Sequence, residues 1–129
     1  MPKRVLFVYG TLKRGGRSNR LLDAQEFLAE AQTLPFYRLY DQGDHPCLVE
    51  DEKRGLAVSG ELWLVDKATL ARLDIYEEVP SLFRGREIKV AGQTTPILAY
   101  LFQGDVSSLK DCGTSWPKGP ARAWSRDNR

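Results

Sequence analysis

An uninterrupted run of five apolar or aromatic residues, Val5 to Tyr9, leads straight into Gly10. A continuous β-prone run bounded by glycine predicts a strand that is buried on both faces. The residues Tyr9, Gly10, Thr11 and Leu12 then open a loop rich in glycine and arginine. Successive backbone N–H groups at the end of such a strand can form a concavity that binds a small anion, for example a carboxylate. We therefore expect a backbone binding site at residues 9–12.

The glycine spacing of residues 10–18 is that of a phosphate-binding loop, but the key side chains are missing. Gly16 and Arg17 stand where such a loop needs its lysine and its serine or threonine. The sequence therefore excludes the usual nucleotide-binding motif. The remaining alternative to a backbone anion site is a surface turn with solvated arginines.

The rest of the chain predicts a mixed α+β order with about six strands and two helices. Ser18 or Asn19 can cap a first helix that carries Leu21, Leu22 and Leu28. Five further stretches have the pattern of strands: two short pieces within residues 33–49 separated by a turn at 41–46, a half-exposed strand at 57–65, and the two strands of a hairpin at 86–90 and 95–102.

The second helix has the clearest boundaries. Asp66 is a natural N-cap, Val65 and Leu70 are spaced as a hydrophobic staple, and Pro80 ends the segment. Winding it at about 100° per residue places Glu77 on the apolar stripe of this helix, and it places Glu78 about 100° away, facing water.

A carboxylate on the buried side of a helix is costly unless it is paired or protonated. Burial raises its pKa toward the range that suits a general base. Glu77 is therefore the candidate acid/base residue. From this pattern alone, fraying of the helix end, which would bring Glu77 and Glu78 both into solvent, is the slightly better interpretation.

Size and charge narrow the possible functions. The chain has 129 residues, 42% apolar and 28% charged, which suits one globular domain. Its 19 Lys and Arg against 17 Asp and Glu leave a net charge of +2, which neither demands nor excludes nucleic acid. The first apolar run is too short for a secretion signal or a membrane span, and with two separated cysteines the expected location is a reducing cytoplasm.

Five pieces of the sequence, in order, resemble the gamma-glutamylcyclotransferase-like family, in its AIG2-like and gamma-glutamylamine cyclotransferase branch. They are "YGTLKRG", "SNRLL", "VSGELWLVD", "LDIYEEVPSLFRGREIKV" and "GTSW". The resemblance implies a small mixed β-barrel flanked by helices. We expect this domain to occupy residues 1–116, followed by a Pro/Gly/Arg-rich tail at 117–129.

The resemblance also implies an activity and its residues. In this family the YGxL loop, here Tyr9, Gly10, Thr11 and Leu12, offers backbone amides to the substrate, and an LDxxE motif places the catalytic glutamate at Glu77. The expected reaction closes the alpha-amine of a gamma-glutamyl compound onto its gamma-carbonyl and releases 5-oxoproline and an amine. It needs a small-molecule substrate but no cofactor, metal, nucleic acid or membrane.

Two positions depart from the family pattern. Glu78 stands where a glycine commonly follows the catalytic glutamate, and Phe83 stands where a tyrosine is common. Glu78 could raise the pKa of Glu77 by charge repulsion or take part itself. Phe83 keeps the aromatic ring but cannot make the hydrogen bond of a tyrosine hydroxyl.

Other candidates point to different classes of protein. His45 and Cys47 could form a nucleophilic pair or part of a metal site, but Pro46 separates them and no third ligand is near, so a packed cysteine and a surface histidine are the better interpretation. The alternative function is a non-catalytic module for small molecules or RNA, in which Trp63, Trp116 and Trp124 would stack bases. The tail could be disordered, cover the pocket or contact a second subunit, and the oligomeric state stays open.

Overall fold

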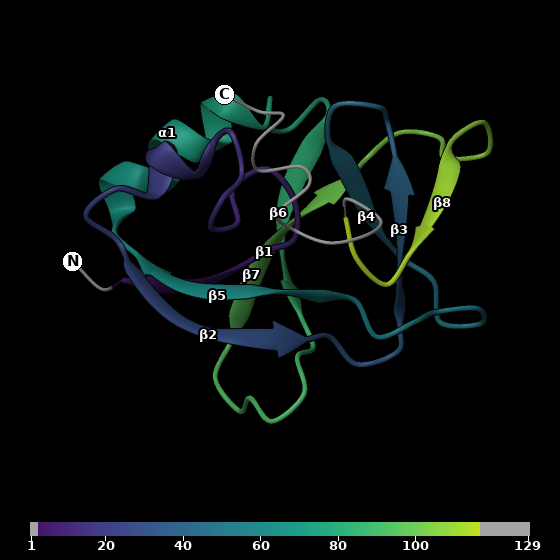
Figure 1. Cartoon of the computed structure of the whole chain (residues 1–129), viewed down its shortest axis with the longest axis horizontal. Helices are drawn as coiled ribbons and strands as arrows, with labels where there is room; N and C mark the ends of the chain where they lie inside the picture. The colour runs from purple at the N-terminus through teal and green to yellow at the C-terminus, as the bar shows by residue number, and fades with distance from the viewer. Residues whose placement is uncertain (1–2, 117–129) are drawn as a thin grey trace.

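The structure is a computed structural model of the chain and describes residues 3–116. It contains one α-helix, one short 3-10 helix and eight strands over these residues (Figure 1). The elements are β1 (Arg4–Val8), η1 (Asn19–Leu22), β2 (Glu26–Gln32), β3 (Tyr37–Asp41), β4 (Pro46–Glu50), β5 (Ser59–Val65), α1 (Lys67–Tyr76), β6 (Phe83–Ile88), β7 (Ile97–Phe102) and β8 (Lys110–Gly113).

The strands form two sheets, and these do not close into the expected barrel. The larger sheet has the order β2-β5-β1-β7-β6, and the smaller has the order β4-β3-β8. An isolated bridge between Thr33 and Val90 is the contact that comes nearest to joining the two edge strands β2 and β6 of the larger sheet. The α+β class is confirmed, and the closed barrel is wrong.

Strand β1 lies at the centre of the larger sheet, as its apolar run predicts. It pairs antiparallel with β5 and parallel with β7, and its last three residues are buried. Strand β5 is also buried on both faces, which corrects the half-exposed pattern expected for it. Leu62 packs into the core shared by the two sheets, whereas Trp63 and Val65 pack into the core beneath α1.

The first predicted helix is mostly wrong. Only the four residues of η1 are helical, and Leu22 is its buried member. Leu28 lies instead in β2, which pairs with β5 along its whole length, and its side chain is exposed. The edge strand β2 and the short strand β8 are the two elements that raise the strand number from six to eight.

Helix α1 begins as predicted, because the Asp66 side chain accepts a hydrogen bond of 2.8 Å from the Thr69 N–H. Val65 and Leu70 both join the core beneath the helix, which fits the hydrophobic staple. In Figure 1, α1 and the small sheet lie at opposite ends of the molecule, with the larger sheet between them. The loop after β1 and the C-terminal end of α1 meet above this sheet.

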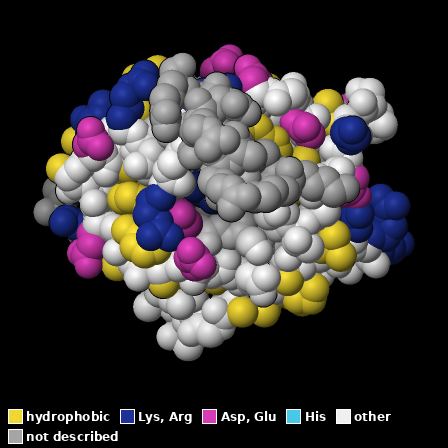
Figure 2. Space-filling view, viewed as in Figure 1, with side chains coloured by type: hydrophobic (Ala, Val, Ile, Leu, Met, Phe, Trp, Pro, Cys, Tyr) yellow, Lys and Arg dark blue, Asp and Glu magenta, His cyan; other side chains and the backbone are white. Residues whose placement is uncertain are grey.

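Within the described range, no helix is long and apolar enough to cross a membrane. The predicted tail at 117–129 and Trp124 lie outside that range. On the face drawn in Figure 2, the visible basic and acidic side chains are interspersed.

Candidate active site

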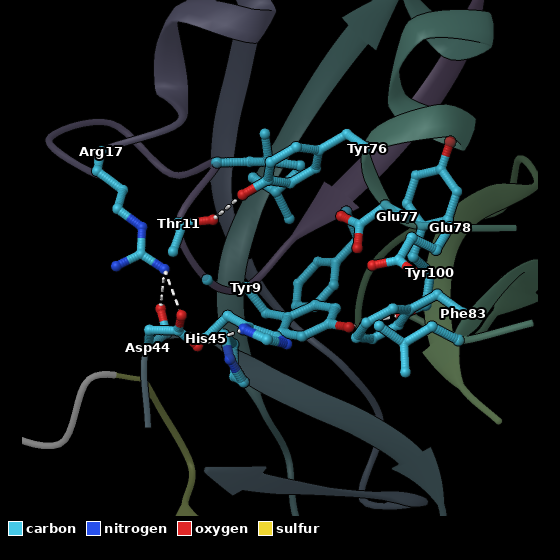
Figure 3. A pocket seen from close by; sticks show the side chains of 16 residues that line it. Tyr9, Thr11, Arg17, Asp44, His45, Tyr76, Glu77, Glu78, Phe83 and Tyr100 are labelled. Carbon is cyan, nitrogen blue, oxygen red and sulfur yellow. Dashed lines mark hydrogen bonds and ion pairs between the residues drawn. The ribbon is translucent and has the colours of Figure 1, made fainter. Parts of the chain in front are cut away.

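A cavity of about 230 Å³ is lined by all five residues that the sequence analysis predicted for the catalytic and substrate-binding site. Tyr9 to Leu12 line it from the loop after β1, and Glu77 lines it from the end of α1. The turn before β4 closes the opposite side with residues 44–46, and Phe83 and Tyr100 contribute from β6 and β7 (Figure 3). The site therefore joins segments that are up to about 90 residues apart in sequence.

Glu77 is the C-cap residue of α1, and its position follows from the helix. Its N–H donates to the Leu73 carbonyl at 2.8 Å, so that Glu77 sits one turn after the fully buried Leu73 and on the same face. Its carboxylate points into the cavity (Figure 3). Burial raises the pKa of this carboxyl from 4.5 to about 7. The group can therefore both accept and return a proton near neutral pH.

Glu78 lies on the same cavity, which the helical pattern did not predict. The helix ends at Tyr76, so the rotation of 100° per residue stops before Glu78. The Glu78 N–H donates to the Ile75 carbonyl at 3.1 Å and the Val79 N–H to the Asp74 carbonyl at 3.0 Å, which is the Schellman arrangement. Glu78 is exposed and adopts the left-handed φ of 53° that this motif normally gives to glycine.

The loop after β1 is held by its own hydrogen bonds in a way that leaves two donors available. Lys13 N–H donates to the Gly10 carbonyl at 3.0 Å, and the Asn19 amide donates to the Leu12 carbonyl at 2.7 Å. Among residues 3–116, no backbone or side-chain acceptor is found for the N–H groups of Thr11 and Leu12. Both residues are 5% exposed. Buried donors without an acceptor favour a bound anion, because an unmet buried N–H is costly.

Gly10 is required for space rather than for an unusual backbone angle. A Cβ atom at Gly10 would lie 2.5 Å from Cγ and 2.6 Å from Cδ of Pro46. Gly10 is not among the residues with positive φ. The close approach of Pro46 is therefore the reason that a glycine is needed at this position.

Tyr76 connects the end of α1 to the loop after β1, and the sequence analysis did not predict this role. Its hydroxyl lies 3.1 Å from Oγ1 of Thr11 and 2.7 Å from Oγ of Ser18 (Figure 3). Ser18 in turn donates its N–H to the Thr11 carbonyl at 3.1 Å. The signal in the sequence was a tyrosine directly before the inward glutamate, at the end of a helix.

A second tyrosine network forms the base of the cavity. The Tyr9 hydroxyl donates to the Tyr100 carbonyl at 2.6 Å, and the Tyr100 hydroxyl donates to Oδ1 of Asp74 at 2.7 Å. Burial raises the pKa of both Tyr9 and Tyr100, which keeps the two phenols protonated. Tyr9 therefore contributes its ring to the cavity wall, while its hydroxyl is committed to Tyr100.

Phe83 lies in the cavity wall as a packing residue. It is 2% exposed, and its ring contacts Phe102 edge to face at 5.5 Å between centroids. The ring of His45 lies 6.3 Å from that of Phe83 between centroids. Phe83 therefore packs against aromatic rings in this chain.

The remaining candidates take structural positions. Cys47 is fully buried, and burial raises the pKa of its thiol to about 12, which keeps the thiolate nucleophile from forming near neutral pH. His45 is on the cavity rim, with Nδ1 2.7 Å from the Asp44 carboxylate. Within the described part of the chain, no group of three His, Cys, Asp or Glu residues could hold a metal ion.

The two described tryptophans of the nucleic-acid alternative do not line the cavity, and neither do two basic residues of the loop after β1, although Arg17 does. Lys13 and Arg14 do not line it, and Arg14 pairs with Glu61 and Glu30 at 3.1 Å each. Trp63 and Trp116 are 7% and 6% exposed and belong to the two cores. These rings are therefore not available as a surface for stacking bases.

The fold and cavity define an AIG2-like α+β protein with a buried carboxyl opposite a loop of backbone donors. In agreement, the sequence profile of the family "Gamma-glutamyl cyclotransferase, AIG2-like" matches residues 6–125. The chain belongs to this family of enzymes.

Individual relatives place the chain among gamma-glutamylcyclotransferases. A Vibrio cholerae protein named "Putative gamma-glutamylcyclotransferase" is 40% identical over 111 residues, which cover 86% of this chain and 94% of that protein. Human gamma-glutamylaminecyclotransferase is 37% identical over 67% of this chain, and the match spans 61% of the human protein. The crystal structure of a mouse AIG2-like protein superposes with a TM-score of 0.80 at 26% identity, covering 93% of this chain and 92% of the mouse chain.

Proposed function

We propose that the chain cyclises gamma-glutamyl compounds, with Glu77 as the general acid/base and the loop at Tyr9 to Leu12 as the substrate cradle. The observation that carries this proposal is the partly buried Glu77 carboxyl, which shares one cavity with the unmatched N–H groups of Thr11 and Leu12. The two features supply the two needs of the reaction, a group that moves protons and donors that hold an anion.

The substrate carries its own nucleophile, so no serine or cysteine is needed. The alpha-nitrogen bonds to the gamma-carbonyl carbon, the amide C–N bond breaks, and 5-oxoproline and a free amine form. Holding the two reacting groups in one molecule already supplies much of the advantage of proximity. This chemistry suits a cavity whose lining, among the described residues, includes neither a serine nor a cysteine.

Glu77 would move one proton through the whole reaction. An alpha-ammonium has a pKa of about 8, and a carboxyl with a pKa of about 7 can take its proton at little cost. The same carboxyl then returns the proton to the nitrogen of the departing amine. The donors of Thr11 and Leu12 would hold either the alpha-carboxylate of the substrate or the oxyanion that develops on the gamma-carbonyl.

The test is a panel of gamma-glutamyl amines and gamma-glutamyl amino acids, with 5-oxoproline and the released amine both quantified. Glu77→Gln should abolish turnover and keep substrate affinity, because the amide preserves the shape but cannot carry the proton. Glu26→Gln, an exposed strand residue outside the cavity, is the matched control and should turn over like the wild type. Tight binding without 5-oxoproline in the wild type would favour a non-catalytic binding module instead.

A further inference from the structure

We propose that Glu78 selects the leaving group, and that it favours gamma-glutamyl derivatives of diamines, whose departing amine carries a second positive charge. This inference rests on the proposed function, because it concerns the part of the substrate beyond the bond that breaks. It assigns to Glu78 a role in specificity that is separate from the proton transfer by Glu77.

The backbone at Glu78 is the first observation. Its φ of 53° lies in the left-handed region, at the Schellman position where glycine has no steric penalty. A glutamate is therefore a conformationally expensive residue here. Strained positions of this kind concentrate at functional sites, where the surrounding structure holds them in place. The Glu78 side chain lines the cavity together with that of Glu77 (Figure 3).

The charge balance around the cavity is the second observation. The charged or titratable side chains that line it, apart from tyrosines, are Arg17, Asp44, His45, Glu77 and Glu78. The Asp44 carboxylate lies 3.7 Å from the Arg17 guanidinium, and it also contacts His45. The negative charge of Asp44 and the positive charge of Arg17 on the rim opposite α1 therefore balance each other. Within the range that the structure describes, neither an ion pair nor a hydrogen bond to the Glu78 carboxylate is found.

The position of Glu78 relative to Glu77 indicates which part of the substrate it meets. The alpha-amine must reach the more buried Glu77, and the alpha-carboxylate or oxyanion must reach the donors at Thr11 and Leu12. The leaving group therefore extends from this inner end toward solvent. Glu78 is the exposed carboxylate on that route, so it meets the leaving group rather than the glutamyl part.

Three substrates whose leaving groups share a four-carbon chain isolate the charge at the far end of the leaving group. They are the gamma-glutamyl amides of 1,4-diaminobutane, butylamine and 4-aminobutanoate, which end in a positive, a neutral and a negative group. For the wild type we expect kcat/KM to fall in this order, by roughly fivefold per step, as suits a partly exposed charge pair. Added salt at about 0.5 M should reduce the differences, because it screens exposed charges.

Glu78→Gln keeps the shape and the left-handed backbone of a non-glycine residue and removes only the charge. The ratio of kcat/KM between the positive and neutral substrates should then fall to about one. Glu26→Gln makes the same change in net charge on an exposed strand and should leave the ratio as in the wild type. An unchanged ratio in Glu78→Gln, or an equal loss for all three substrates, would overturn the proposal, since an equal loss would place Glu78 at the glutamyl end.

A binding measurement separates this proposal from the proposed function. The three compounds are titrated into the Glu77→Gln variant and into the Glu77→Gln/Glu78→Gln double variant. The charge preference is then read from the ratio of Kd between the positive and neutral compounds, without any turnover. A charge preference in the single variant that disappears in the double variant supports the role of Glu78, even if the wild type releases no 5-oxoproline. Loss of turnover in the wild type would overturn only the cyclotransferase assignment, and equal Kd values in Glu77→Gln would overturn only the role of Glu78.

Discussion

The hydroxyl of Tyr76 lies 2.7 Å from Oγ of Ser18, and this contact joins the end of α1 to the loop after β1 across 58 residues of sequence. The same hydroxyl reaches Thr11 at 3.1 Å. Because Glu77 follows Tyr76 directly and Thr11 carries one of the unmatched N–H groups, these two hydrogen bonds set the position of the carboxyl relative to the backbone donors. Tyr76 is therefore a positioning residue for the proposed reaction.

Tyr76→Phe should lower kcat/KM by about tenfold, which corresponds to the loss of a hydrogen bond worth about 1.4 kcal/mol. The ring stays in place, so the free energy of unfolding should fall by only about 1 kcal/mol. Steady-state kinetics as a function of pH is the informative measurement, because the rate should fall while the apparent pKa of Glu77 stays near 7. Thr11→Ser keeps a hydroxyl partner for Tyr76 and serves as the control. Full activity in Tyr76→Phe would show that the loop holds its position without this contact.

Gly10→Ala should impair both stability and activity, because the new methyl group would meet Pro46 at 2.5 Å. Overpacking of this kind costs about 1 to 3 kcal/mol, and the displaced turn carries residues 44–46 of the cavity wall. The free energy of unfolding, measured in urea, and kcat/KM should therefore both fall.

A second substitution tests whether Pro46 is the cause. Pro46→Ala removes the two ring atoms that the Gly10→Ala methyl group would strike. In the double variant the effects should be less than additive, with a coupling energy of at least about 1 kcal/mol. Strict additivity would mean that Gly10 is needed for another reason, such as the approach of a ligand.

The pH dependence of stability should report the burial of Glu77. Its pKa is about 7 in the folded chain, against 4.5 for an ordinary glutamate. Below pH 4.5 the carboxyl is protonated in both states, so burial carries no ionic cost. As pH rises toward 7, the unfolded chain loses the proton first, and the free energy of unfolding falls. Above pH 7 the folded chain bears the full cost of a buried carboxylate.

Glu77→Gln removes that cost and should be more stable than the wild type at pH 8.5 by about 1 to 3 kcal/mol, since each pKa unit is worth about 1.4 kcal/mol. At pH 4 the two proteins should agree to within about 0.5 kcal/mol. Urea unfolding at both values of pH gives the comparison, with Glu26→Gln as the control for an exposed carboxyl. A difference that does not change with pH would mean that the Glu77 carboxyl titrates as it does in water.

The parts of the fold that local chemistry decides were predictable from the sequence. The start of α1 depends on the Asp66 side chain and the Thr69 N–H, which lie three residues apart. The apolar run from Val5 to Tyr9 was enough to predict a strand buried on both faces, and β1 does lie between two other strands. Glu77 was found because Leu73 lies one helical turn before it. In each case the deciding contact lies within one element or at its boundary.

The sequence-based predictions were wrong mainly where contacts with residues distant in sequence determine the structure. Residues 26–32, "EFLAEAQ", are rich in good helix formers, but pairing with β5 holds them as a strand. Strand β8 has no apolar alternation and forms because β3 pairs with it. Barrel closure depends on whether the edges of β2 and β6 meet, and no local pattern encodes that contact. The cavity position of Glu78 was missed because the helix ends before it.

The backbone at Glu78 supports a last prediction, which concerns stability alone. Glu78→Gly should raise the free energy of unfolding relative to Glu78→Ala by about 1 kcal/mol, because a φ of 53° costs alanine energy that glycine does not pay. Both variants lose the carboxylate, so the difference between them isolates the conformation. The greater freedom of glycine in the unfolded chain reduces the gain but does not reverse it. Thermal and urea unfolding measure the difference, and the same pair of substitutions at Glu87, within β6, should favour alanine. If Glu78→Gly were no more stable than Glu78→Ala, the left-handed turn would carry no cost, and the conformational part of the case for Glu78 would fail.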